Sequence, residues 1–127
     1  MTKQVIHTTS APTSALYSQE VKTGSTIYVS GMVGMDPATK QMIGPTIQAQ
    51  TLQALRNCQA IVEAGGGRLH DVVQVTVLLA NPSDFVGMNE AYAQFFPTDP
   101  PVRAVARLGP ELPGVLVSVM MTASLGD

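Results

Sequence analysis

The clearest periodic pattern of apolar and polar residues lies between Thr46 and Ala64. Apolar side chains recur there at helical spacing, while most polar side chains fall on the other side. The apolar stripe consists of Ile47, Leu52, Leu55, Ile61 and Val62, with Thr51 and Cys58 between them. Gly65-Gly66-Gly67 follows at once, and glycine is common just past the end of a helix. The pattern predicts an amphipathic helix over residues 46–64.

The rest of the chain reads mainly as short strands with one further helix. Runs of β-branched and apolar residues predict strands at 4–7, 18–21, 26–29, 71–79, 102–106 and 115–123. A glycine-containing turn at 22–25 joins the second strand to the third, and the glycines at 31 and 34 end the third. A second helix is predicted over 85–96, with Pro82-Ser83-Asp84 as its cap. This order predicts one α+β domain over residues 1–127, with two helices on one face of a sheet.

Two helices leave the other face of this sheet without cover. The predicted strands at 72–79 and 115–123 are nonetheless apolar on both alternations, apart from a few polar side chains. A strand buried on one face only alternates cleanly between apolar and polar residues. Charged residues make up only 13% of the chain, where about a quarter is usual. We therefore expect the uncovered face to pack against other subunits of an oligomer.

Composition excludes several classes of protein. The net charge of −2 and the pI of about 5.5 argue against nucleic-acid binding. Cys58 is the only cysteine, which leaves no disulfide and is typical of a small core residue. His7 and His70 have no partner at ligand spacing, so no metal site is expected. The chain has neither a membrane-spanning apolar run nor the apolar segment of a signal peptide at its start, and we expect a cytoplasmic protein.

Arg103 is the most prominent candidate for chemistry. The chain has only 7 Lys and Arg residues, yet this one stands in the apolar run Val102-Arg103-Ala104-Val105-Ala106. Pro100 and Pro101 favour an extended backbone before it, so the arginine is expected on a strand. A guanidinium presents a planar fork of N–H donors that suits a small carboxylate. A surface arginine on an edge strand is the plainer interpretation of the same pattern.

Several motifs occur in order along almost the whole chain. They are Leu16-Tyr17-Ser18-Gln19, Val29-Ser30-Gly31, Asp36-Pro37-Ala38-Thr39, Ala49-Gln50-Thr51, Met88-Asn89-Glu90-Ala91-Tyr92 with Phe95-Phe96, and Pro101-Val102-Arg103. Together they resemble the Rid proteins, the YjgF-like family of reactive intermediate/imine deaminases. The resemblance implies a chorismate-mutase-like α+β fold and a homotrimeric barrel with ligand clefts between neighbouring subunits. It also implies hydrolysis of 2-imino acids to 2-oxo acids and ammonium, with no metal, nucleotide or pyridoxal cofactor.

The same resemblance implies the site residues. Its substrate-binding positions correspond to Arg103, which would bind the carboxylate, and to Tyr17, Ser30, Gly31, Asn89 and Val105, the last through its backbone. Ser118 falls where the family's deaminases carry a glutamate that orients the attacking water, and with Arg103 it forms the expected catalytic pair. Because a hydroxyl is a poor base, a non-catalytic trimer that binds small carboxylates or keto acids, as a sensor or chaperone, remains an alternative. An endoribonuclease is the less favoured alternative, given the acidic pI.

Overall fold

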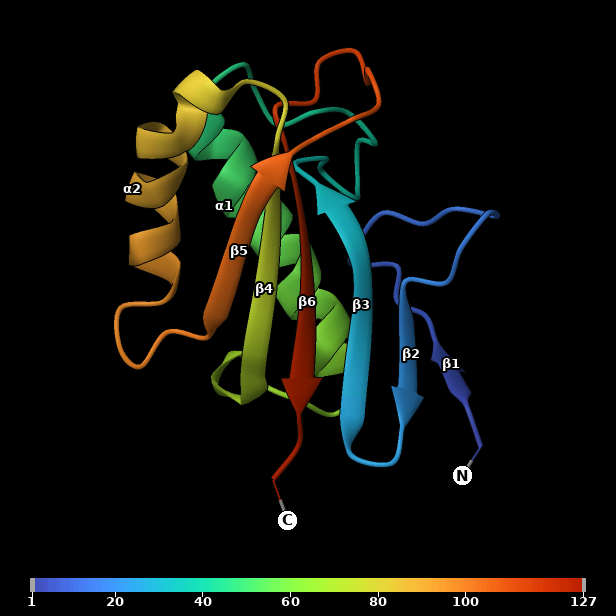
Figure 1. Ribbon diagram of the computed structural model, residues 1–127. Helices are drawn as coiled ribbons and strands as arrows, with labels where there is room; N and C mark the ends of the chain where they lie inside the picture. Colours follow the sequence, from blue (N-terminus) through green and yellow to red (C-terminus); the bar gives the residue numbers. More distant parts are fainter. Residues whose placement is uncertain (1, 127) are drawn as a thin grey trace.

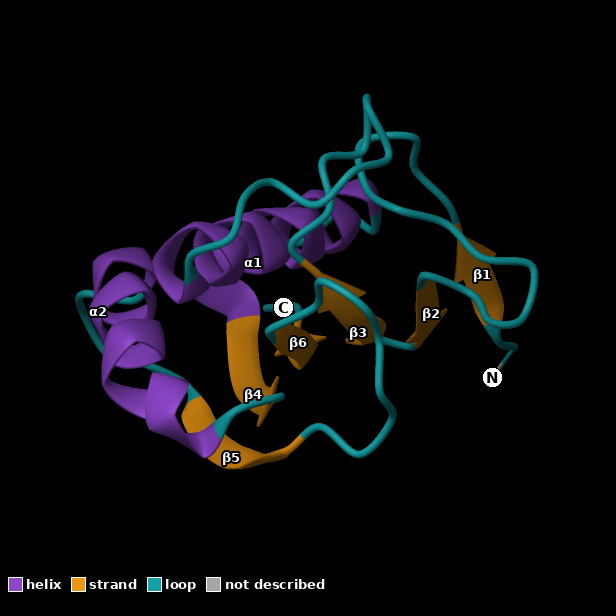
Figure 2. Cartoon of the chain, turned by 90° about the horizontal axis from the view of Figure 1, so that it is seen from above, coloured by secondary structure: helices purple, strands orange, loops and turns teal. Residues whose placement is uncertain are grey.

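The protein was analysed as a computed structural model, which describes residues 2–126. A six-stranded sheet carries two helices on one face (Figures 1 and 2). The strands are β1 (Gln4–Ile6), β2 (Glu20–Thr23), β3 (Thr26–Val33), β4 (Val72–Leu79), β5 (Val102–Arg107) and β6 (Val117–Ser124). The helices are α1 (Ile47–Ala64) and α2 (Phe85–Phe95), with short 3-10 turns at Leu69–Asp71 and Pro82–Asp84. The predicted α+β architecture is confirmed.

The sheet order is β1-β2-β3-β6-β4-β5. β4 and β5 run parallel, whereas the other neighbouring strands run antiparallel. Since α2 connects β4 to β5, it lies beside that edge of the sheet, and α1 covers the middle (Figure 2). No helix within residues 2–126 is both long and apolar enough to span a bilayer.

The core fills the space between the sheet and the two helices. The predicted apolar stripe of α1 is largely buried, and its Cys58 is fully buried. Gln50 and Asn57 are also buried, which the stripe did not predict. The Gln50 amide group donates to the carbonyl oxygens of Gly44 and Gly114, and Asn57 donates to those of Val33 and Met35. These two side chains therefore attach the loops at the end of the sheet to α1.

The ends of the two helices differ in how well they were predicted. Thr46 caps α1 by accepting a hydrogen bond from the Ala49 amide at 3.2 Å. At the other end Gly66 takes a φ of 92°, and the Gly67 amide bonds to the Val62 carbonyl at 3.0 Å, as the glycine run predicted. Asp84 is the N-cap residue of α2, where the sequence predicted the cap, but its side chain makes no cap hydrogen bond. Residues Pro82–Asp84 form a 3-10 turn that leads into the helix.

The sequence suggested that the third strand ends at its glycines, but it does not. β3 continues to Val33, and its register against β6 shifts between Val29 and Met32, so a bulge accommodates the glycine at 31. Two other boundaries also need correction. Ser18 lies before β2, which begins at Glu20, and Val115 lies in a turn before β6, where its amide bonds to the Leu112 carbonyl at 3.0 Å.

The face of the sheet opposite the helices is open and partly apolar. Tyr28, Val102 and Met120 are exposed on this face, because each alternates with residues that point into the core. Figure 2 shows both helices on the other side of the sheet. We call this surface the open face.

Candidate functional site

Arg103 lies on the helix side of β5, where it faces α2. It pairs in register with Val75, a core residue of β4, and paired residues of neighbouring strands point to the same side. Its Nη1 atom donates a hydrogen bond of 2.7 Å to the Asn89 side-chain oxygen. The guanidinium carbon is 4.7 Å from the centre of the Tyr92 ring and 5.9 Å from that of Phe85. The arginine is thus held against one face of α2.

None of these contacts carries a negative charge. Asn89 occupies one of the five N–H donors of Arg103, and the guanidinium lies over two uncharged aromatic rings. The side chain is otherwise exposed. Burial raises the pKa of Tyr92, and the positive charge of Arg103 partly opposes that rise. Arg103 therefore keeps both its positive charge and free donors for an anionic ligand.

Phe85, Met88 and Tyr92 are apolar residues of α2. With Asn89 they occupy positions i, i+3, i+4 and i+7 of the helix, so they share one side. That side contacts both the core and Arg103, since Met88 is fully buried while its sulfur lies 4.0 Å from Nη1. The helical spacing of Asn89 with three apolar residues is the signal that could have identified this cluster from the sequence.

Ser118 and Gly31 meet on the open face. Ser118 pairs with Val33 and Leu78, between neighbours that point into the core, so its hydroxyl faces away from the helices. A Cβ atom at position 31 would lie only 2.9 Å from the Ser118 oxygen. Glycine at this position in the bulge therefore leaves room for the hydroxyl.

Ser30, beside this pair, is already engaged with the preceding loop. Its hydroxyl donates to the Ser18 carbonyl oxygen at 2.5 Å, and its amide donates to the Gln19 carbonyl at 2.9 Å. Gln19 is buried and donates from its side chain to the carbonyl oxygens of Thr8, Ala11 and Pro12. Gln19 thus fixes the loop that carries the exposed Tyr17. The sequence indicated Gln19 only as part of a motif and predicted no role for it.

The sheet separates the predicted site residues into two groups. Arg103, Asn89 and Val105 lie on the helix side of β5, whereas Gly31 and Ser118 lie on the open face of β3 and β6. The strand β4 runs between β6 and β5 (Figure 1). A single chain therefore does not bring the predicted catalytic pair of Arg103 and Ser118 together.

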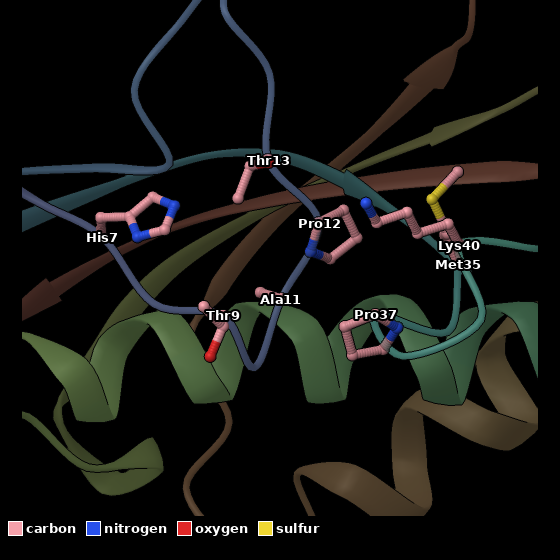
Figure 3. Close-up of a pocket in the computed structure, with 8 residues that line it drawn as sticks. All are labelled: His7, Thr9, Ala11, Pro12, Thr13, Met35, Pro37 and Lys40. Carbon is pink, nitrogen blue, oxygen red and sulfur yellow. The ribbon is translucent and has the colours of Figure 1, made fainter.

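A separate hollow of about 400 Å³ lies between the N-terminal loop and the turn after β3. His7 and Thr13 line it from the loop and Pro37 and Lys40 from the turn, with His7 and Lys40 at opposite ends (Figure 3). It contains none of the predicted site residues. It lends no support to the predicted chemistry.

The fold and the residues described above define an α+β protein with an arginine available on an edge strand. Residues 8–125 match the family model described as Endoribonuclease L-PSP. The human 2-iminobutanoate/2-iminopropanoate deaminase is 37% identical over 125 residues, which cover 98% of this chain and 91% of the human protein. The chain belongs to the Rid (YjgF, L-PSP) family.

Solved structures of the family agree with this assignment. RidA from the Antarctic bacterium Psychrobacter is 36% identical to this chain, and the two structures superpose with a TM-score of 0.89. The alignment covers 96% of this chain and 99% of RidA. TdcF from E. coli, solved with bound serine, is 29% identical, with a TM-score of 0.90 over 97% of this chain and 99% of that one. The match is thus nearly complete in both directions.

Proposed function

We propose that the protein hydrolyses 2-imino acids to 2-oxo acids and ammonium, in clefts between the subunits of a homotrimer. The observation that carries this proposal is the state of Arg103, which α2 holds in place without neutralising its charge. A bidentate pair between guanidinium and carboxylate suits a group held in this way. The names of the relatives support the ligand class, since the human protein is a 2-imino acid deaminase and TdcF was solved with an amino acid.

The chemistry requires little from the protein beyond positioning. Protonated imines have an electrophilic carbon, so water can add there while Arg103 holds the carboxylate. Addition of water converts the C=N double bond to a C–N single bond and gives a carbinolamine. Collapse of the carbinolamine to the 2-oxo acid expels the nitrogen, which leaves as ammonium with the protons of the water. A hydroxyl such as that of Ser118 can hold the water by a hydrogen bond but does not deprotonate it.

Two observations support a trimer. The open face displays apolar side chains that a neighbouring subunit would cover, among them Val102 and Met120. In addition, the two groups of site residues lie on opposite sides of one sheet, so a complete cleft needs two chains. We propose that Arg103, Asn89 and Val105 of one subunit face Tyr17, Ser30, Gly31 and Ser118 of the next.

The test is ammonia release from 2-aminoacrylate and 2-iminobutanoate, formed in situ by a pyridoxal-phosphate dehydratase. Arg103→Lys keeps the charge but loses the planar fork, so we expect kcat/KM to fall by about 10-fold or more while the unfolding midpoint hardly changes. Arg56→Lys, on the exposed side of α1, is the matched control and should behave as wild type. Unfolding of the Arg103 variant, combined with no binding of 2-oxobutanoate to the wild type, would make the arginine structural.

A keto-acid sensor without catalysis is the second candidate, and Ser118 is the observation that favours it. The residue offers no acid or base in the expected position. Calorimetric binding of 2-oxobutanoate without hydrolysis of any 2-imino acid would establish this alternative. The ribonuclease in the description of the family model has less support here, because the net charge of −2 does not favour a phosphate backbone.

A further inference from the structure

A hollow of about 470 Å³ lies along β5, beginning two residues beyond Arg103. It is lined by Leu79, Pro82, Phe85, Val105, Ala106 and Arg107, and we call it the β5 hollow. We propose that it receives the side chain of the substrate, so that 2-imino acids with branched or aromatic side chains are preferred over 2-iminopropanoate. This inference rests on the proposed function and adds a substrate class to it.

Proximity to the arginine is the first argument. Phe85 lines the β5 hollow, and its ring is also 5.9 Å from the guanidinium carbon of Arg103. Val105 follows two residues later on the same side of β5, about 7 Å along the strand. That distance is comparable with the length of a leucine-sized substrate. A carboxylate on Arg103 would therefore place the side chain of such a substrate in the hollow.

The chemistry of the walls is the second argument. Leu79, Pro82, Phe85 and Val105 are apolar, and the only charged side chain, Arg107, comes two residues beyond Val105 along β5. The methyl group of 2-iminopropanoate would leave most of the space to water. A larger apolar side chain would displace that water and bury its own surface. The hollow thus favours a large apolar side chain on the substrate and does not require a polar group there.

The size of the effect follows from the number of buried carbons. Each buried methylene favours binding by about fourfold. The leucine-derived imine has three more carbons than the alanine-derived one, and it would be partly buried. We expect its kcat/KM to be about 10- to 50-fold higher.

The experiment compares imines that an amino-acid oxidase forms in situ from alanine, leucine and phenylalanine. Calorimetry with pyruvate, 4-methyl-2-oxopentanoate and 2-oxoglutarate measures the same preference without catalysis. Val105→Phe fills the β5 hollow, and should lower the leucine-to-alanine ratio of kcat/KM by about 10-fold. Val86→Phe, next to Phe85 but 71% exposed, adds the same ring outside the hollow and should keep the wild-type ratio.

The outcomes separate this inference from the proposed function. Hydrolysis of all three imines at similar rates, with similar affinities for pyruvate and 4-methyl-2-oxopentanoate, would overturn the inference and leave the deaminase intact. Graded affinities without any hydrolysis would support the β5 hollow and overturn the deaminase. Tighter binding of 2-oxoglutarate than of 4-methyl-2-oxopentanoate would show that Arg107 sets the preference, and it would overturn the apolar class proposed here.

Discussion

Arg103 and Asn89 join β5 to α2 through a hydrogen bond of 2.7 Å from the guanidinium to the amide oxygen. The amide accepts this bond without carrying a charge, so it orients the arginine and leaves its attraction for anions intact. A carboxylate in the same place would compete with the ligand carboxylate for the Arg103 guanidinium. The neutrality of position 89 is therefore as important to the candidate site as its geometry.

Asn89→Asp tests this relationship directly. The new carboxylate should pair with Arg103 and displace the ligand carboxylate, so we expect affinity for 2-oxobutanoate to fall by about 10-fold or more. Asn89→Ala removes the orienting bond but adds no charge, and its loss should be severalfold smaller. Calorimetry on both variants provides the comparison. Wild-type affinity in Asn89→Asp would show that Arg103 does not bind the ligand.

Glu20 makes stability depend on pH. The side chain is 1% exposed, neither of its carboxyl oxygens has a hydrogen-bond partner within residues 2–126, and burial raises its pKa to about 7. The charge of Lys22 opposes this rise only in part. Since the folded state holds the proton more tightly than the unfolded chain, the free energy of unfolding should fall as the pH rises from 4.5 to about 7.

Glu20→Gln should remove that dependence, because glutamine occupies a similar volume and does not titrate. We expect the variant to be more stable than wild type at pH 8 and to differ less at pH 5. Urea unfolding at the two pH values measures the effect. Glu63→Gln, on the exposed side of α1, serves as the control and should keep the wild-type dependence. A wild type that is equally stable at both pH values would contradict the raised pKa.

Ser118 decides how fast the proposed reaction can be. General-base assistance is worth about 10²–10⁴-fold, so the wild type should be slower than a form with an acid at this position by a factor of that order. Ser118→Glu should raise kcat for 2-iminobutanoate, and Ser118→Ala should lower it modestly. Steady-state ammonia release measures both changes. If Ser118→Glu stays folded and trimeric but is no faster than the wild type, position 118 does not contact the water.

We expect the open face to hold the proposed trimer together. Met120→Lys places a charge among the exposed apolar side chains of this face, so we expect it to dissociate the assembly or prevent its formation. Val86→Lys puts the same charge on an exposed apolar position of α2 and should leave assembly unchanged. Light scattering at micromolar concentration reports the mass. A stable wild-type monomer would refute both the trimer and the composite cleft.

Most of the fold was readable from local patterns. The stripe of α1 and the glycines after it predicted both ends of that helix to within a residue, because spacing and capping act over a few positions. The bulge at Gly31 was missed, since it is a feature of the pairing between β3 and β6, a strand far away in sequence. Asp84 was correctly placed at the N-cap of α2, whereas the 3-10 turn over Pro82–Asp84 was not predicted.

The candidate site was harder to predict than the fold. Arg103 could be singled out because a cation within the apolar run 102–106 needs a reason. The contacts of Arg103 with Asn89 and Tyr92 could not be predicted, since the sequence does not show which side of β5 faces α2. Nor does it state the strand order that puts β4 between Arg103 and Ser118. Both facts arise from tertiary packing.

The division of the site by the sheet also has a genetic consequence. In the proposed trimer each cleft takes its arginine half from one chain and its Gly31 half from the next, so a defect in either half inactivates every cleft of a pure trimer. The two defects can complement each other, because the three subunits meet in a closed cycle. Any hybrid of an Arg103 variant with a Gly31 variant contains one cleft in which both halves are intact. Two inactive proteins, mixed at random during refolding, should therefore regain about a quarter of the wild-type rate.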